Sequence, residues 1–133
     1  MSTDAASSSR ERSSALLRHP IHSGHLTVGA LKRNKDKPVL FLGATTLTGG
    51  ELAERISQYI QAFEALGAGT GVVSGLLALN RPEVLMILGA GQTQGYRRLS
   101  LHPLGSLDDH AYVPNDAGVT SLTIDPNPMF VER

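Results

Sequence analysis

Patterns typical of helices and patterns typical of strands alternate along the middle of this chain. A stripe of apolar residues spaced three and four apart predicts a helix over residues 51–66. The apolar run at 72–77 indicates a buried strand, residues 81–94 a second helix, and residues 97–101 a second strand. Because parallel strands need long crossover connections, this alternation favours an α/β fold with a largely parallel sheet flanked by helices.

Short-range signals at the ends of these helices support the assignment. Thr48 and Glu51 have the spacing of a capping box, and Gly67 supplies the left-handed residue that commonly follows a helix. Asn80 as an N-cap, with Pro82 in the first turn, predicts the start of the second helix. This second helix is apolar all round, so we expect it to be covered on more than one side.

Further elements at the two flanks complete the expected order. They are a helix from Thr27 to Asn34, a β-hairpin over 39–48 that turns at Gly43, a helix that Ser106 caps and Gly118 ends, and a strand over 122–124. From the hairpin onward the predicted order is β-hairpin, α, β, α, β, α, β. Pro114 falls inside the last helix, where it removes a backbone hydrogen bond, and we expect it to strain or end that helix.

The first 25 residues differ in composition from the rest. They are rich in serine and contain charged residues and histidines, so they have little to bury, and we expect a disordered leader over 1–25. Residues 26–133 are of a size that forms one α/β domain. The longest apolar run, at 84–90, is far too short to span a membrane, and no apolar stretch of the leader has the length of a secretory signal.

Charge and cysteine content exclude several kinds of partner. Twelve basic residues balance twelve acidic ones, which gives no basic excess to favour DNA, RNA or an anionic membrane. Without cysteine the chain forms no disulfide and no thiolate metal site. We therefore expect no nucleic-acid partner, no membrane span and a cytoplasmic location.

Three glycine-rich segments invite comparison with nucleotide-binding loops. Residues 89–95 miss the G-x-G-x-x-G pattern because Gln94 occupies its last glycine position, and they lie inside or at the end of a helix rather than before one. Residues 67–71 follow a helix and precede a strand, which is the reverse order, and residues 43–50 have no P-loop lysine. We interpret all three as turns and helix-packing positions.

Histidines and charged residues form two further candidate clusters. His19, His22 and His25 have a regular spacing that could serve a zinc ion, but they have no nearby carboxylate or thiolate and fit a solvated loop better.

The second cluster consists of His102 and His110 on either side of Asp108 and Asp109. The two carboxylates fall in the first turn of a helix, where they offset its dipole. The nearby pair at 97–98, Arg97 and Arg98, could bind an anion. Adjacent strand residues point to opposite faces, however, and we expect both arginines to be solvated. We assign no catalytic, cofactor-binding or metal-binding residue from these clusters.

From residue 32 onward the chain contains a series of short stretches whose order and spacing can be compared with known families. In order, they are Pro38-Val39-Leu40, Thr46-Leu47-Thr48 leading into Glu51-Leu52-Ala53-Glu54-Arg55, Ala65-Leu66-Gly67, Asn80-Arg81-Pro82-Glu83 with the apolar helix that follows, Leu101-His102-Pro103, Ser106-Leu107-Asp108-Asp109-His110-Ala111-Tyr112-Val113, and Asp116-Ala117-Gly118. In their order and spacing these stretches resemble the N-terminal region of the acyl-CoA synthetase family, the AMP-binding or adenylate-forming enzymes, and are most similar to the fatty-acyl-CoA ligases.

The resemblance implies an incomplete N-terminal subdomain of an adenylate-forming enzyme over residues 26–133. Full-length family members activate a carboxylic acid with ATP and transfer it to coenzyme A, with ATP, magnesium and coenzyme A as cofactors. This chain lacks the family's phosphate loop and its catalytic lysine. The resemblance therefore implies a fatty-acid–CoA ligase segment that is inactive alone and binds none of these cofactors, with no catalytic residue carried over.

Departures from the family pattern leave a second interpretation open. Gly49 stands where an aromatic is usual, Val72-Val73-Ser74 replaces an acidic-basic-valine run, and Pro114 takes a position usually held by leucine. We expect partners of the chain to be either a second copy of itself or the remainder of a related enzyme. The alternative function is a free-standing binding or oligomerisation module derived from the same fold.

Overall fold

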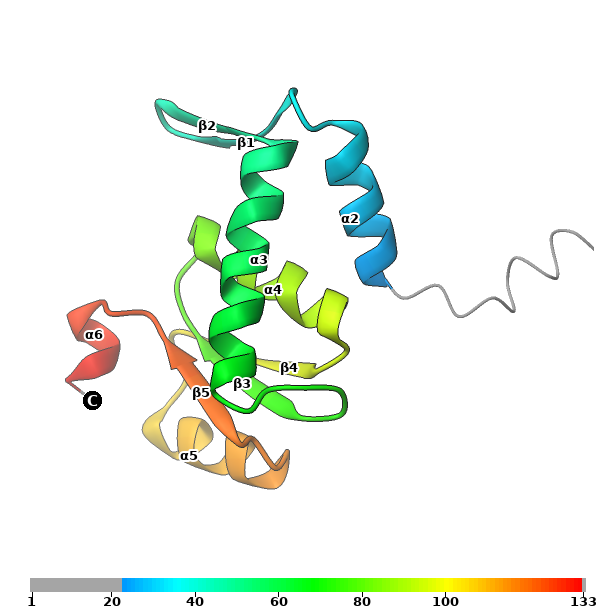
Figure 1. Ribbon diagram of the computed structural model, residues 1–133. Coiled ribbons are helices and arrows are strands. Elements are labelled where there is room, and N and C mark those ends of the chain that lie inside the picture. Colours follow the sequence, from blue (N-terminus) through cyan, green and yellow to red (C-terminus); the bar gives the residue numbers. More distant parts are fainter. Residues whose placement is uncertain (1–22, 133) are drawn as a thin grey trace, which may run out of the picture.

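The computed structural model describes residues 23–132, in which five helices and five strands follow one another (Figure 1). In chain order they are α2 (Ser23–Arg33), β1 (Pro38–Leu42), β2 (Thr45–Thr48), α3 (Gly49–Ala65), β3 (Val73–Leu77), α4 (Pro82–Gln94), β4 (Arg97–Leu101), α5 (Leu107–Asp116), β5 (Ser121–Ile124) and α6 (Pro128–Val131). The predicted order from the hairpin to the last strand is confirmed. None of the helices in this described part is long and apolar enough to cross a membrane.

Three parallel strands form the sheet, in the order β4-β3-β5. Strand β3 lies in the centre, and all of its residues are buried. The hairpin β1-β2 is a separate antiparallel pair that turns at Gly43, whose φ is +60°. The expected α/β fold with a partial parallel sheet is therefore confirmed.

The two faces of the sheet are covered by different helices (Figure 1). Because side chains alternate along a strand, Leu76 points into one apolar cluster and Leu77 into the other. The cluster around Leu76 contains eight buried residues, drawn mainly from α2, α3 and α4: Leu31, Ile56, Phe63, Leu76, Met86, Ile87, Ala90 and Tyr96. The cluster around Leu77 contains only Leu77, Leu101 and Phe130 as buried members.

Local signals at the ends of α3 act as the sequence predicts. The Thr48 side chain accepts a hydrogen bond from the Glu51 N–H, and the Glu51 carboxylate accepts one from the Thr48 N–H at 2.8 Å. Gly67 has a φ of +82°, the left-handed region that favours glycine. A similar capping box between Ser106 and Asp109 begins α5.

Close packing explains the glycines of α4. A Cβ atom on Gly89 would lie 2.7 Å from the Cδ1 atom of Ile56 on α3, and one on Gly91 would lie 2.8 Å from the Tyr96 ring. Both contacts are shorter than packed carbon atoms tolerate. The interpretation of residues 89–95 as a helix-packing segment is confirmed.

Helix α2 begins earlier than the sequence suggests. The expected N-cap, Thr27, lies inside the helix, where its hydroxyl group donates to the Gln92 Oε1 atom on α4 at 3.1 Å. Residues 23–25, which we assigned to the leader, are helical, and His25 is among them. The rest of the proposed leader, with His19 and His22, lies outside the described residues.

Two further expectations differ from the structure. The N-cap of α4 is Arg81, which makes no capping hydrogen bond, and not Asn80. The short helix α6 was not expected because four residues are too few to show a periodic pattern. Its Asn127 cap and the proline that follows are, however, the same start signal as the one at Asn80 and Pro82.

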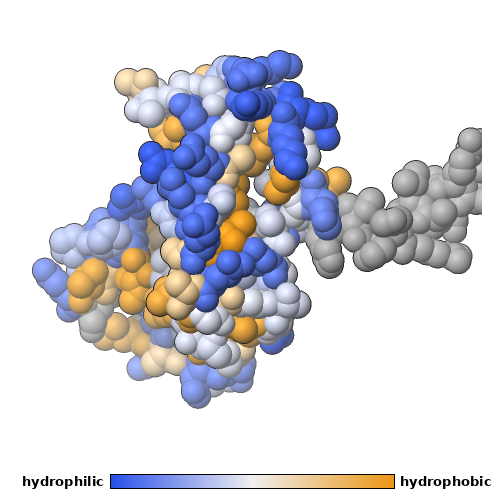
Figure 2. Space-filling model, viewed as in Figure 1, coloured by the Kyte–Doolittle hydropathy of each residue, from blue (hydrophilic) through white to orange (hydrophobic). Residues whose placement is uncertain are grey.

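The exposed surface is unevenly apolar. Figure 2 shows hydrophilic residues along the outer sides of α2 and α3, and apolar residues gathered near α6 and the end of β5. Ile124, Met129 and Val131 in that region are 42%, 40% and 65% exposed.

Candidate functional site at the carboxyl edge of the sheet

The carboxyl ends of the three parallel strands meet at one edge of the sheet. Ligands of open α/β sheets bind at this edge, in the crevice beyond the strand ends. The chain leaves β3 toward Arg81 at the start of α4, leaves β4 at His102, and leaves β5 at Asp125. These loops therefore hold the polar groups with the best position for a site.

An ion pair joins two of these loops. The Nη1 atom of Arg81 donates to the Oδ1 atom of Asp125 at 2.9 Å, and the Asn127 N–H donates to the same oxygen at 3.0 Å. The Asp125 side chain is only 1% exposed, whereas that of Arg81 is 44% exposed. The Oδ2 atom of Asp125 is buried without a hydrogen-bond partner among the described residues.

The surroundings of Asp125 favour its ionised form. Burial acts to raise the pKa of Asp125, but the Asn127 N–H and the Arg81 guanidinium outweigh burial and hold that pKa below its usual range. The hydrogen bond and charge of Asp125, followed by the charge of Glu83, raise the pKa of Arg81. Each partner therefore stabilises the charge of the other. The charge of Arg81 is largely neutralised by Asp125 within the chain.

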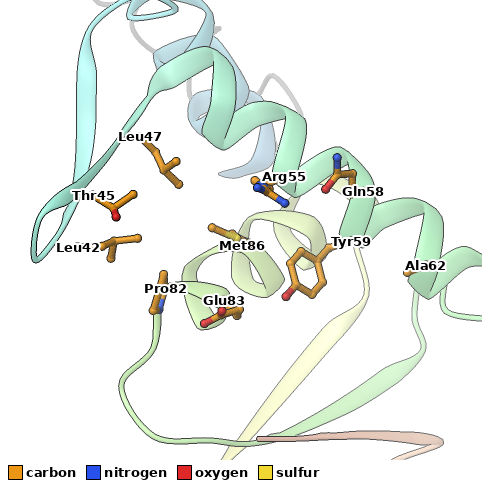
Figure 3. Close-up of a pocket in the computed structure, with 10 residues that line it drawn as sticks. All are labelled: Leu42, Thr45, Leu47, Arg55, Gln58, Tyr59, Ala62, Pro82, Glu83 and Met86. Atoms are coloured by element: carbon orange, nitrogen blue, oxygen red, sulfur yellow. The ribbon is translucent and has the colours of Figure 1, made fainter. Parts of the chain in front are cut away.

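Two cavities lie beside this ion pair. A groove of about 480 Å³ lies between the hairpin, α3 and the start of α4. Its lining residues are Leu42, Thr45, Leu47, Arg55, Gln58, Tyr59, Ala62, Pro82, Glu83 and Met86 (Figure 3). A second cavity of about 250 Å³ lies between the first turn of α4 and the ends of β3 and β5, and includes Arg81 and Asp125. Tyr59 and Glu83 line both cavities.

The polar groups at the boundary of the two cavities interact only weakly. Figure 3 shows Tyr59 extending from α3 toward the start of α4. Burial, and then the charge of Glu83, raises the pKa of the Tyr59 hydroxyl group. The Arg81 Nε atom lies 3.4 Å from the Glu83 carboxylate, and both side chains are more than 40% exposed, so this contact contributes little to stability.

The helix N-termini at this edge are poorly suited to phosphate. The positive end of a helix dipole attracts anions. Here the first turn of α4 carries Glu83, and that of α5 carries Asp108 and Asp109. These carboxylates already offset the helix dipoles and would repel a phosphate group, so the described residues do not fit a nucleotide phosphate at this edge.

No metal centre is found in the described part of the chain. Residues 23–132 contain no group of three or more histidine, cysteine or acidic side chains close enough to share an ion. His102 and His110 do meet, but through a backbone atom: the His110 Nε2 atom lies 2.8 Å from the His102 carbonyl oxygen. The His102 Nδ1 atom in turn accepts from the Leu104 N–H at 3.1 Å. Both imidazoles therefore serve the loop before α5.

The two candidate arginines of β4 differ in their surroundings. Arg97 is exposed, as expected. The expectation that Arg98 is solvated is wrong, because this side chain is partly buried and its Nη1 atom is fully buried. Arg98 lies on the face of the sheet that α4 covers, and this face could not be identified from the sequence.

Sequence reasoning did not single out the Arg81–Asp125 pair. The two residues are 44 positions apart, and neither belongs to a motif with a charge-pair spacing. A usable signal did exist, because an acidic residue directly after a predicted parallel strand lies at the carboxyl edge by topology.

Comparison with known proteins identifies relatives of this chain. The sequence profile of the family described as AMP-binding enzyme matches residues 29–131. The medium/long-chain-fatty-acid–CoA ligase FadD8 of Mycobacterium tuberculosis is 78% identical over 121 residues, which are 91% of this chain and 21% of that protein. The chain thus spans about a fifth of the length of this curated relative.

Solved structures show the same fold at lower identity. The N-terminal subdomain of NpsA from Klebsiella oxytoca, in complex with 3-hydroxybenzoyl-AMSN, superposes with a TM-score of 0.73 at 18% identity. This match covers 78% of the present chain and 26% of the NpsA chain. O-succinylbenzoate coenzyme A synthetase (MenE) from Bacillus subtilis, in complex with AMP, gives a TM-score of 0.70 at 19% identity over 75% of this chain and 26% of MenE.

Proposed function

The chain belongs to the AMP-binding enzyme family, and from this premise we propose that it acts as the N-terminal segment of a fatty-acid–CoA ligase. The observation that carries the proposal is the 78% identity to the mycobacterial ligase over 121 residues. Such a ligase activates a fatty acid with ATP and transfers the acyl group to coenzyme A. In this proposal the segment contributes structure to the ligase, and the reacting groups come from other segments.

The chemistry of the carboxyl edge supports a structural role. Arg81, the cation at this edge, is paired with the buried Asp125. The helix N-termini there carry Glu83, Asp108 and Asp109, which disfavour an ATP phosphate. ATP, magnesium and coenzyme A would accordingly be held by parts of the ligase outside this chain. A cytoplasmic location and a role in lipid metabolism belong to the same proposal.

A chimera tests the proposal directly. The matching 121 residues of the mycobacterial ligase are replaced by those of this chain, and acyl-CoA formation is measured with a fatty acid, ATP and coenzyme A. We expect the chimera to be active, because the substituted segment keeps its fold and contacts. A folded but inactive chimera would contradict the proposal.

Activity of the chain by itself is the second part of the test. We expect no acid-dependent exchange of pyrophosphate into ATP and no acyl-CoA formation, because the described residues offer no phosphate-binding group at the carboxyl edge. Activity above that of a preparation without the chain would show that reacting groups lie within it.

An association module is the alternative function, and one observation favours it. Leu122 and Ile124 on β5 are each 42% exposed, and β5 is an edge strand with no neighbour on its outer side among the described strands. Exposed apolar residues beside an unpaired strand edge are typical of an interface. In a ligase the later part of the enzyme would cover this region, and in an isolated chain a second copy would do so.

A further inference from the structure

A third cavity lies away from the carboxyl edge, where the beginning of α2, the last turn of α4 and β4 come together. Its volume is about 370 Å³, and its polar lining comes from Ser23, Gln92, Tyr96 and Arg98. The ion pair and the two cavities described above share none of these residues.

Arg98 is directed to the face of the sheet that α4 covers. It pairs in register with Ser74, which is 2% exposed, and lies two residues from the buried Tyr96. Its Nη1 atom is buried and has no hydrogen-bond partner among residues 23–132. The salt bridges among the described residues all involve Arg81, so no carboxylate in this part of the chain neutralises Arg98.

Among the described residues, no acceptor in the surroundings of Arg98 bonds to its Nη1 atom. The Tyr96 hydroxyl group donates to the Ile87 carbonyl oxygen at 3.4 Å. At the end of α4, the Gly91 carbonyl oxygen accepts from the Gly95 N–H, and the Gln94 carbonyl oxygen accepts from the Thr70 hydroxyl group. The partial negative charge at this helix end favours the guanidinium, but it does not supply the missing acceptor for Nη1.

A buried donor without an acceptor is costly, and more so when it carries a charge. Burial lowers the pKa of Arg98, which is the direction expected for a cation that has lost water without gaining a counter-ion. A guanidinium remains charged under all ordinary conditions. Arg98 therefore lines the cavity as a cation that has no counter-ion among the described residues, and its Nη1 atom has no acceptor there.

We propose that this cavity binds an oxyanion, a phosphate or carboxylate group, with Arg98 as its principal ligand. The planar fork of donors on arginine matches two oxygens of either group. Gln92 is suited to assist, because its Oε1 atom accepts from Thr27 and its amide N–H groups remain available as donors. The hydroxyl group of Ser23 lies at the same cavity. A volume of about 370 Å³ leaves room for a small organic group attached to the anion.

Arg97 provides a matched control. It is the adjacent residue on the same strand, carries the same charge, and is exposed. A substitution there changes the net charge of the chain by the same amount without touching the cavity. Arg98→Gln and Arg97→Gln therefore separate binding in the cavity from general electrostatic attraction.

The test uses the full chain and two titrations, one with inorganic phosphate and one with acetate, at constant ionic strength maintained with sodium chloride. Binding to the folded state raises the melting temperature with the logarithm of the anion concentration above the dissociation constant, by about 4–8 °C at roughly ten times that constant. We expect this rise with at least one of the two anions in the wild type and in Arg97→Gln, and its loss in Arg98→Gln. The anion that gives the larger rise in melting temperature shows whether the cavity prefers a phosphate or a carboxylate group.

Two further readouts keep the proposal falsifiable. Arg98→Gln should be more stable than the wild type in buffer free of both anions, because it removes an uncompensated charge, and Arg97→Gln should not be. If Arg98→Gln fails to fold, the Arg98 Nε–H signal in NMR spectra of the wild type must shift during the titration. No rise of the melting temperature with either anion, or an equal rise in Arg98→Gln, would overturn the proposal.

Discussion

The two faces of the parallel sheet differ in how completely this chain covers them. On the face toward α3 and α4, eight buried residues form a continuous cluster, and the glycines of α4 allow it to pack directly against Ile56. On the face toward α5 and α6 the apolar cluster has only three buried members, and α5 contributes none of them. The face toward α3 and α4 is covered by helices of this chain, whereas the face toward α5 and α6 is covered only in part.

The two faces differ because α5 buries less apolar surface than α3 and α4 do. A helix stabilises a sheet by burying an apolar stripe, and α5 has apolar side chains that stay exposed: Leu107 is 56% and Tyr112 is 66% exposed. In the function proposed above, the later part of the ligase would pack against the α5 face.

The largest effect should come from a matched pair of phenylalanines. Phe63 in the eight-residue cluster and Phe130 in the three-residue cluster are 6% and 5% exposed. We expect Phe63→Ala to lower the free energy of unfolding by about 3–5 kcal/mol. Phe130→Ala should lower it by only about 1–2 kcal/mol, because the four-residue α6 can detach without unfolding the rest. Urea denaturation of both variants measures the difference, and equal losses would show that the two faces are equally integrated.

Pro114 on α5 gives the next effect, with the opposite sign. Helix α5 continues through Pro114 to Asp116, so the His110 carbonyl oxygen lacks its helical donor and the proline ring crowds it. We expect Pro114→Leu to raise the free energy of unfolding by about 1–3 kcal/mol. Thermal unfolding followed by circular dichroism measures this, and an unchanged midpoint would mean that the face toward α5 and α6 is too loosely packed to register the strain.

Acid should weaken the ion pair between Arg81 and Asp125 at the carboxyl edge and thereby lower stability. Because the pKa of folded Asp125 lies below its ordinary value of 3.8, its contribution to stability is complete above that pH and is lost as pH falls through the lowered pKa. Asp125→Asn should therefore be less stable at pH 7 and should lose less stability below pH 3.8 than the wild type.

Glu51→Gln is the control for this acid effect. The pKa of Glu51 is also lowered, by hydrogen bonds from Thr48, but the residue is an exposed helix cap, and we expect a smaller change. Denaturant midpoints between pH 2 and pH 7 give the comparison. If the stability of Asp125→Asn depended on pH in the same way as that of the wild type, the Arg81–Asp125 ion pair would not contribute to stability.

Association should change without any large change in stability. If the open face pairs copies of the chain, replacing Leu122 and Ile124 with threonine should reduce the mass measured by light scattering, because threonine keeps the strand preference and removes apolar area. Leu66→Thr is the control, since Leu66 is 73% exposed at the end of α3 and is not part of β5. A wild type that is monomeric at all concentrations would show that the face toward α5 and α6 does not pair with a second copy of the chain.

Much of the fold could be predicted because its signals are local. The capping boxes at Thr48 and Ser106 join residues three positions apart, and Gly67 and Gly118 adopt the positive φ that their place after a helix requires. Such interactions depend on a few consecutive residues, so they hold wherever the segment lies in the fold. The same locality explains why the element order was predicted correctly.

The candidate site and the cavity at Arg98 depend on contacts between distant parts of the chain. Asn80 has the residue type of an N-cap, yet α4 begins one residue later, where the side chain of Arg81 reaches Asp125, 44 positions away. Arg97 and Arg98 are identical in type, and only the covering of β4 by α4 leaves one in solvent and places the other beside Tyr96. Most of the elements, their order and the capping boxes of α3 and α5 follow from the sequence alone, because periodicity and short-range hydrogen bonds specify them. The tertiary structure alone decided which charges are buried and paired, because desolvation depends on what packs over a side chain and not on its neighbours along the chain.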